Sequence, residues 1–149
     1  MSWTSPMAVL RDLAKRRLDD TTMHLGKAQQ HYLKTIRQHQ MLETYQAEYQ
    51  QALQLNMAEQ GMPTREWINR QSFIDSLVKA VHQHAQDVDD SKRQLDNAMA
   101  SWRIDKQRLS ALETLKSRAD ADRARQQSKQ EQKMMDEFAQ RAYEGKRAI

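Results

Sequence analysis

The sequence is poor in the residues that reverse a chain or cross-link it. Among its 149 residues there are 3 glycines, 2 prolines and no cysteine. Without cysteine the chain can form neither a disulfide framework nor a thiolate-based site. A compact globule of this length needs many turns, and glycine and proline are prominent among the residues that make them. The composition therefore predicts long uninterrupted helices with about one reversal between them.

Long apolar runs are also missing. Only 38% of the residues are hydrophobic, and no stretch approaches the roughly 18 consecutive apolar residues that suggest a membrane span. We expect the opening segment MSWTSPMAVLRDLAKRR not to be a signal peptide, because it contains no long apolar run. Glutamine, alanine, leucine and charged residues dominate, which favours helix over strand. The predicted fold class is all-α.

The chain also lacks a block of charge of one sign. It has 24 basic and 20 acidic residues, interleaved along the chain, and a formal net charge of +4. The basic cluster around Arg16 and Arg17 is followed at once by Asp19 and Asp20, which weakens a phosphate-binding face. We interpret the charges as a solvated helical surface. We expect no nucleic-acid partner. The alternative from another class is a basic coiled-coil rod that binds nucleic acid, with affinity that falls steeply as salt rises.

Residues with catalytic or ligand-binding patterns are absent as well. The five histidines form no pair four residues apart, and no glycine-rich loop is present to hold a phosphate. The many carboxylates have no enclosed pocket in a two-helix protein that would shift their pKa values. We therefore expect no catalytic residue, no cofactor and no metal site, and we expect that the chain is not an enzyme.

Two short signals predict where the helices begin and end. Ser5 can cap a first helix, and Pro6 is tolerated at its first position. Gly61 and Pro63 make the only clear break, after which Thr64 is expected to cap a second helix. We predict a single coiled-coil domain over residues 1–149. Its predicted parts are helix one at about 6–58, a loop at about 59–64, helix two at about 65–143, and an unpaired extension at 117–149.

The predicted second helix carries an apolar residue at every seventh position. The coiled-coil core residues of this row are Trp67, Ile74, Val81, Val88, Leu95, Trp102 and Leu109. A sustained seven-residue repeat is typical of a left-handed coiled coil. The first helix has a weaker repeat, in which His39 and Gln46 are polar. One break between two such segments predicts a long two-helix antiparallel coiled-coil hairpin with the second helix longer.

The hairpin predicts which residues face one another. With the turn at Gly61, the residue numbers of facing positions add up to about 122, so Leu10 faces Leu112 and Leu13 faces Leu109. The apolar row of helix two ends near Leu115, where helix one runs out of length. The polar extension beyond carries a short apolar cluster at Met134, Met135 and Phe138. We considered binding of this cluster to a membrane surface, but the nearby Asp136, Glu137 and Glu144 argue against it.

Near the loop, each helix carries extra apolar and aromatic residues beside its core row. We call these eight residues the edge patch: Gln38, Leu42, Tyr45 and Tyr49 on helix one, and Phe73, Leu77, Ala80 and His84 on helix two. Each set falls on one edge of its helix, and the register places the two edges side by side. One interpretation is a locally thicker core. The other is a protein-binding surface, where exposed aromatic residues are typical.

Four segments carry a resemblance to a known family. They are MLETYQAEYQ at 41–50, REWINRQSFIDSLVKAVHQH at 65–84, SWRIDKQRL at 101–109 and KMMDEFAQRA at 133–142. They resemble the FliJ family of the bacterial flagellar export apparatus over nearly the full chain. The equivalent stalk protein of a virulence type III secretion system is the runner-up, although the WIN and DEFAQR motifs favour the flagellar family.

The resemblance implies a stalk and chaperone-escort protein with several partners. These are the hexameric export ATPase FliI with its regulator FliH, the export-gate protein FlhA, and export chaperones for late substrates. In the family, the gate-contacting surface matches the edge patch. We assign ATPase binding to Leu10, Leu13, Arg17, Met134, Met135 and Phe138. The implied location is cytoplasmic, peripheral at the inner face of the cell membrane and held there only through the gate complex.

Overall fold

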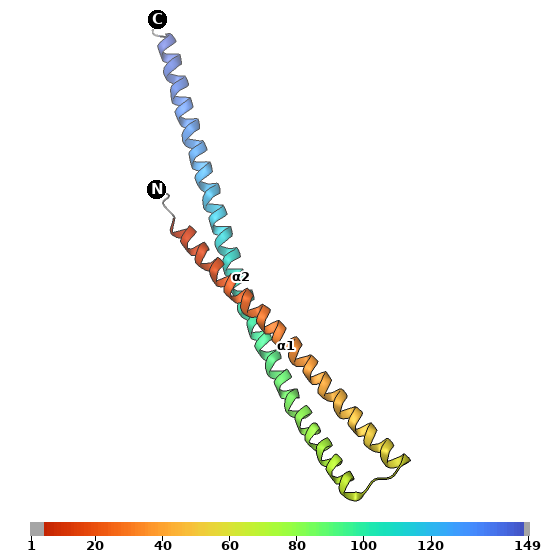
Figure 1. Cartoon of the computed structure of the whole chain (residues 1–149). Helices are drawn as coiled ribbons and strands as arrows, with labels where there is room; N and C mark the ends of the chain where they lie inside the picture. Colours follow the sequence, from red (N-terminus) through yellow and green to blue (C-terminus); the bar gives the residue numbers. More distant parts are fainter. Residues whose placement is uncertain (1–4, 148–149) are drawn as a thin grey trace. The chain divides into compact units, whose positions relative to one another are not determined.

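The computed structural model describes residues 5–147, which form two helices joined by a short loop (Figure 1). Helix α1 spans Pro6–Glu59 and helix α2 spans Thr64–Arg147. They contain 54 and 84 residues, so the second helix is the longer one. The described part of the chain contains no strand. The predicted all-α helical hairpin with a longer second helix is confirmed. Neither helix contains an apolar stretch long enough to cross a bilayer.

Helix α1 begins as the sequence predicts. The Ser5 Oγ accepts a hydrogen bond from the backbone N–H of Ala8 at 3.2 Å, and the Ser5 carbonyl accepts from Ala8 and Val9 at 3.0 and 3.2 Å. These bonds occupy backbone donors that the first turn of a helix otherwise leaves free. Pro6 takes the first helical position, where its missing N–H costs nothing.

The loop spans residues 60–63 and is one residue shorter at each end than predicted. Gly61 has a φ of +67°, the left-handed conformation that commonly follows the end of a helix and that glycine adopts without strain. On the other side, the N–H of Trp67 donates to the carbonyl of Pro63 at 3.0 Å. Pro63 therefore supplies the first carbonyl acceptor of α2. Thr64 is the first helical residue, and the expectation that it caps the helix is wrong.

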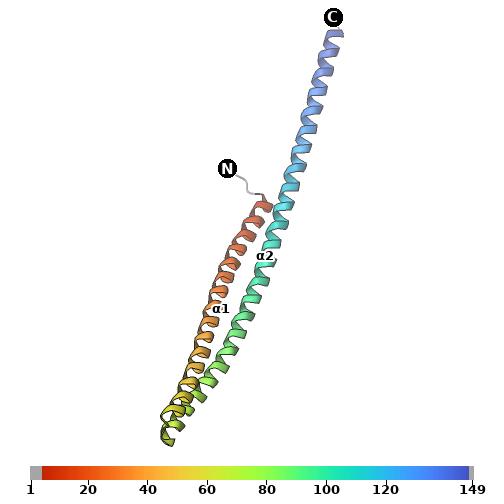
Figure 2. The ribbon, with the colours of Figure 1, turned by 90° about the vertical axis from the view of Figure 1, so that its right-hand side faces the viewer.

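The chain divides into two compact units, each built from both helices. We call residues 19–104 the loop unit, and residues up to 18 together with those from 105 onward the terminal unit. In the loop unit, α1 and α2 leave the loop side by side and run in opposite directions, as Figure 1 and Figure 2 both show.

Three contacts define the register within the loop unit. The rings of Tyr49 and Phe73 lie 5.0 Å apart, and those of His39 and His84 lie 5.9 Å apart. Near the other end of the unit, the indole N–H of Trp102 donates to the Thr22 hydroxyl at 3.1 Å. The residue numbers of these pairs add up to between 122 and 124. The spacing predicted from the turn at Gly61 therefore agrees with these pairs.

The core of the loop unit is a narrow seam. Leu53 and Ile74 are its buried apolar residues, and Ile74 is only 2% exposed. Four further members of the predicted apolar row are half-buried: Val81, Val88, Leu95 and Trp102. Trp67 is the exception, with 38% of its surface exposed. It lies close to the loop, where α1 ends at Glu59 and few residues remain to cover a large ring.

Two buried positions of the seam are polar. The hydroxyl of Thr35 donates to the carbonyl of His31, and that of Ser91 donates to the carbonyl of Val88, both at 2.8 Å. Each bond stays within its own helix. The seam can therefore bury these side chains without leaving a donor unpaired, although they contribute less apolar contact than leucine would.

Replacement of Ile74 with Ala should destabilise the protein strongly. The change removes most of a side chain that is 2% exposed and leaves a cavity in the seam, so we expect a loss of about 2–4 kcal/mol in the free energy of unfolding. Ile68→Ala is the matched control on the same helix. Ile68 is 54% exposed, and its truncation should change the urea midpoint little. Equal losses in the two variants would contradict the seam.

Candidate protein-binding site

All eight residues of the edge patch lie in the loop unit, four on each helix. Its aromatic members are well exposed, at 51% for Tyr45, 45% for Tyr49 and 48% for Phe73. Leu42, Leu77, Ala80 and His84 are half-buried beside them, and Gln38 is exposed. The patch is therefore anchored in the seam by its smaller residues and presents its rings to solvent.

The three rings form a continuous run across the two helices. Tyr45 and Tyr49 are one helical turn apart and stack with their centroids 6.4 Å apart. Tyr49 then meets the ring of Phe73 on α2 edge to face, at 5.0 Å and an interplanar angle of 64°. Such contacts orient the rings and stabilise them modestly beyond the apolar area that they bury. The ring run is thus a continuous apolar surface that spans both helices.

At the other end of the patch, Gln38 and His84 line a shared polar cavity of about 360 Å³. His84 also stacks on His39, with ring planes 14° apart. The Nε2 of His39 lies 2.5 Å from a carboxylate oxygen of Glu43, one turn along α1. The Nδ1 atoms of both histidines are buried and have no hydrogen-bond partner among the described residues.

The seven-residue repeat did not predict this histidine pair. By the sequence pattern, His39 is a weak member of the α1 repeat and His84 is a polar end of the edge patch. The signal was present, because the two residue numbers add up to 123, close to the expected register. What the repeat could not reveal is that two imidazole rings would stack there rather than turn outward to water.

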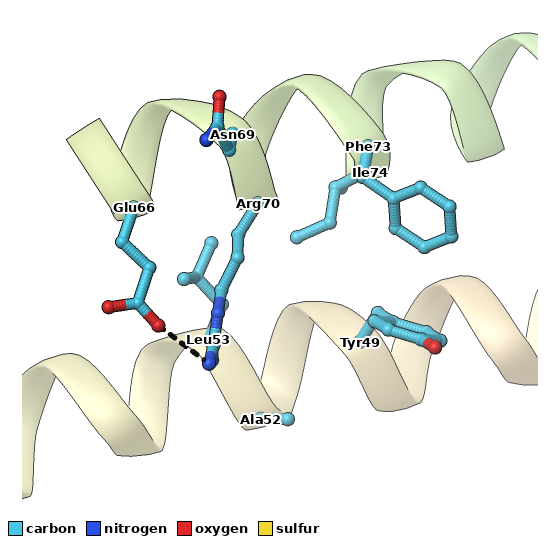
Figure 3. Close-up of a pocket in the computed structure, with 8 residues that line it drawn as sticks. All are labelled: Tyr49, Ala52, Leu53, Glu66, Asn69, Arg70, Phe73 and Ile74. Carbon is cyan, nitrogen blue, oxygen red and sulfur yellow. Dashed lines mark hydrogen bonds and ion pairs between the residues drawn. The ribbon is translucent and has the colours of Figure 1, made fainter. Parts of the chain in front are cut away.

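A second cavity adjoins the loop-side end of the edge patch. We call this space of about 450 Å³ the tip cavity, and it is lined by Tyr49, Ala52, Leu53, Glu66, Asn69, Arg70, Phe73 and Ile74. Figure 3 shows the rings of Tyr49 and Phe73 at one end and the Arg70–Glu66 ion pair at the other. That pair has an N···O distance of 3.0 Å. The edge patch therefore continues toward the loop as a hollow.

The residues assigned to ATPase binding lie in the terminal unit. Leu10, Leu13 and Arg17 line a groove of about 190 Å³ together with Ala14, Arg108 and Leu112. The predicted partners Leu10 and Leu112 thus share one groove. The neighbouring residues Arg11 and Glu113 form an ion pair with an N···O distance of 3.7 Å.

The other three residues of that assignment lie in the polar extension. Met134, Met135 and Phe138 are 69%, 73% and 76% exposed. They do not line the groove of Leu10, Leu13 and Arg17. All residues from Asp120 to Lys146 are exposed, yet α2 continues through them to Arg147. An exposed apolar cluster on a polar helix is typical of a surface that another protein covers.

Within residues 5–147, no group of three histidine, aspartate or glutamate side chains is arranged to hold a metal ion. Among the described residues, large apolar and aromatic side chains are exposed along both helices. Fold and surface together define a class: coiled-coil hairpins that expose apolar and aromatic side chains suited to contact with other proteins.

Comparison with known proteins identifies the family within that class. The family described as "Flagellar FliJ protein" matches residues 4–148. The Flagellar FliJ protein of Salmonella typhi is 38% identical over 142 residues, which are 95% of this chain and 96% of that protein. The Flagellar FliJ protein of Escherichia coli K12 is 39% identical over 136 residues, 91% of this chain and 92% of that protein. The chain belongs to the FliJ family, as its motifs predicted, and is a flagellar export component.

Replacing both stacked histidines with leucine should stabilise the loop unit. A buried polar atom without a partner costs about 1–3 kcal/mol, and His39→Leu with His84→Leu removes two such atoms and adds apolar contact to the seam. The contact between His39 Nε2 and the Glu43 carboxylate is also lost, but that carboxylate is 57% exposed and the contact contributes little. We expect the free energy of unfolding to rise by about 1–3 kcal/mol in urea titrations.

The matched control replaces His24 and His82, both exposed, with leucine. It should leave the free energy of unfolding nearly unchanged. A destabilised His39/His84 double variant would mean that the imidazoles contribute bonds that leucine cannot replace.

Proposed function

We propose that this chain links the export ATPase to the export gate of the flagellar protein-export apparatus, without catalysing a reaction itself. The observation that carries the proposal is the run of three exposed, mutually packed rings on one edge of the loop unit of a FliJ-family protein. The packing of a two-helix seam does not require aromatic rings at its edge. Their exposure is best accounted for by a partner that covers them.

The edge patch is the proposed binding site for the cytoplasmic part of the gate protein FlhA. About half of each of the three rings remains accessible. Complete burial of an aromatic side chain contributes roughly 1.5–3 kcal/mol, so covering the remaining half of three rings offers several kcal/mol to a complex. Leu42, Leu77 and Ala80 are half-buried and extend the apolar surface along the same edge. This arrangement resembles a hot spot, with anchored aromatic groups surrounded by polar residues.

The terminal unit is the proposed binding site for the ATPase FliI and its regulator FliH. Its two features suited to this role are the groove of Leu10, Leu13 and Arg17, and the exposed Met134, Met135 and Phe138. Separate surfaces for the two partners would let both bind at once. Escort of export chaperones for late substrates belongs to the same proposal, as does a location at the inner face of the membrane through the gate.

Replacing Tyr45, Tyr49 and Phe73 with alanine should abolish gate binding. The variant removes the rings but leaves the buried Leu53 and Ile74 in place, so helicity and ATPase association should persist. We expect gate affinity to fall by at least about a hundredfold, equivalent to roughly 2.7 kcal/mol. Calorimetric titration of the cytoplasmic part of FlhA with the purified chain measures this change.

A control triple variant uses residues of similar exposure outside the edge patch. Leu33, Leu55 and Ile68 are each about half exposed, and their replacement with alanine should not weaken gate binding. If the ring variant unfolds or melts several degrees lower while it keeps its gate affinity, the rings are core residues and the proposed gate site is wrong.

Deletion of residues 118–149 should separate folding from ATPase binding. Every described residue from Asp120 to Lys146 is exposed, so the deletion removes few contacts, and the melting temperature should change by no more than a few degrees. Association with FliI should weaken, because Met134, Met135 and Phe138 are lost. Gate binding serves as the internal control and should be retained. A large fall in melting temperature would mean that the extension is part of the folded core.

A further inference from the structure

The tip cavity is not accounted for by the edge patch alone. Its lining shares only Tyr49 and Phe73 with the patch, and it adds five side chains that lie closer to the loop along with the buried Ile74. The cavity opens beside the two rings that meet at 5.0 Å (Figure 3). Tyr49 and Phe73 belong to both surfaces, so a partner that covers these rings also contacts the lining of the cavity.

The residues that line the tip cavity favour the binding of an uncharged group. Leu53, Ile74 and the two rings provide an apolar interior, and Leu53 and Ile74 are themselves buried. The only charged groups at the cavity are Glu66 and Arg70, which are paired with each other at 3.0 Å. Because these charges offset one another, the cavity has no unpaired charge that would favour an ionic group. Asn69 adds one neutral polar group at the rim.

We propose that the tip cavity receives a large uncharged side chain, aliphatic or aromatic, from the same gate protein that covers the edge patch. This inference rests on the proposed function, because it takes the gate as the partner. It extends the binding surface past the eight patch residues to Ala52, Asn69 and Arg70. The side chain inserts between α1 and α2 and packs on Leu53 and Ile74. Apolar anchors in pockets of this kind dominate the affinity of many interfaces.

Filling the cavity from its own wall tests the proposal. Ala52 is exposed and lines the cavity, so Ala52→Leu occupies part of the space without disturbing the seam. Ala47 is also an exposed alanine in α1, but it does not line the cavity, and Ala47→Leu is the matched control. We expect Ala52→Leu to weaken binding of the cytoplasmic part of FlhA roughly tenfold, as expected when one buried apolar group is displaced. Ala47→Leu should bind as the unaltered chain does.

A size series at position 52 distinguishes insertion from contact at the rim. Ala52→Ser barely changes the side-chain volume and should bind normally, whereas Ala52→Met, close to leucine in volume, should weaken binding about as much as Ala52→Leu does. Circular dichroism melts of all variants should coincide with that of the unaltered chain, because position 52 is exposed.

The outcomes separate this inference from the proposed function. If Ala52→Leu binds the gate protein as tightly as Ala47→Leu while the triple ring variant does not bind, nothing enters the tip cavity and the gate site stands without it. If the ring variant binds normally, or the unaltered chain does not bind the gate protein, both proposals are overturned. Equal weakening by both leucine variants would likewise argue against insertion.

Discussion

Two helices can hide only one narrow face of each other, and this limit governs the rest of the protein. In the loop unit the seam buries Leu53 and Ile74 fully, while most other members of the predicted apolar row are half-buried. Any apolar residue off that face stays in contact with water. A globular protein could turn such residues inward, but a helix pair has no second layer to cover them. Exposed rings at the edge therefore either leave apolar area unfavourably in water or form a binding surface.

The seam also buries polar residues, and these differ in whether their polar atoms form hydrogen bonds. Thr35 and Ser91 are buried, and each donates its hydroxyl hydrogen to a carbonyl of its own helix. The buried Nδ1 atoms of His39 and His84 have no hydrogen-bond partner among the described residues, and the two rings stack on each other. The loop unit thus places its least apolar layers between the ring run on one side and the Trp102–Thr22 contact on the other. The buried apolar residues Leu53 and Ile74 lie next to the ring run, whereas Gln38 and His84 of the edge patch lie in the polar layers.

The edge patch and the tip cavity are both formed by residues of the helix pair itself. Leu42, Leu77 and Ala80 are half-buried, so the edge patch includes residues that belong in part to the seam. The tip cavity arises close to the loop, where Ala52 supplies only a small side chain between larger neighbours. A surface with protruding rings and an adjacent hollow can be matched by a partner in both shape and apolar character.

The period of the sequence was sufficient to predict the two helices, their antiparallel register and the faces on which the edge patch and the apolar row lie. A residue's angular position on a helix follows from its number, and the single break at Gly61 sets which numbers meet. Contacts between side chains needed the tertiary structure. The exposure of Trp67, the stacking of His39 on His84 and the tip cavity beside Phe73 depend on the local separation of the helices and on rotamer choice. A repeat specifies the direction of each side chain, whereas the distance to the opposing helix is decided by all the side chains packed between them.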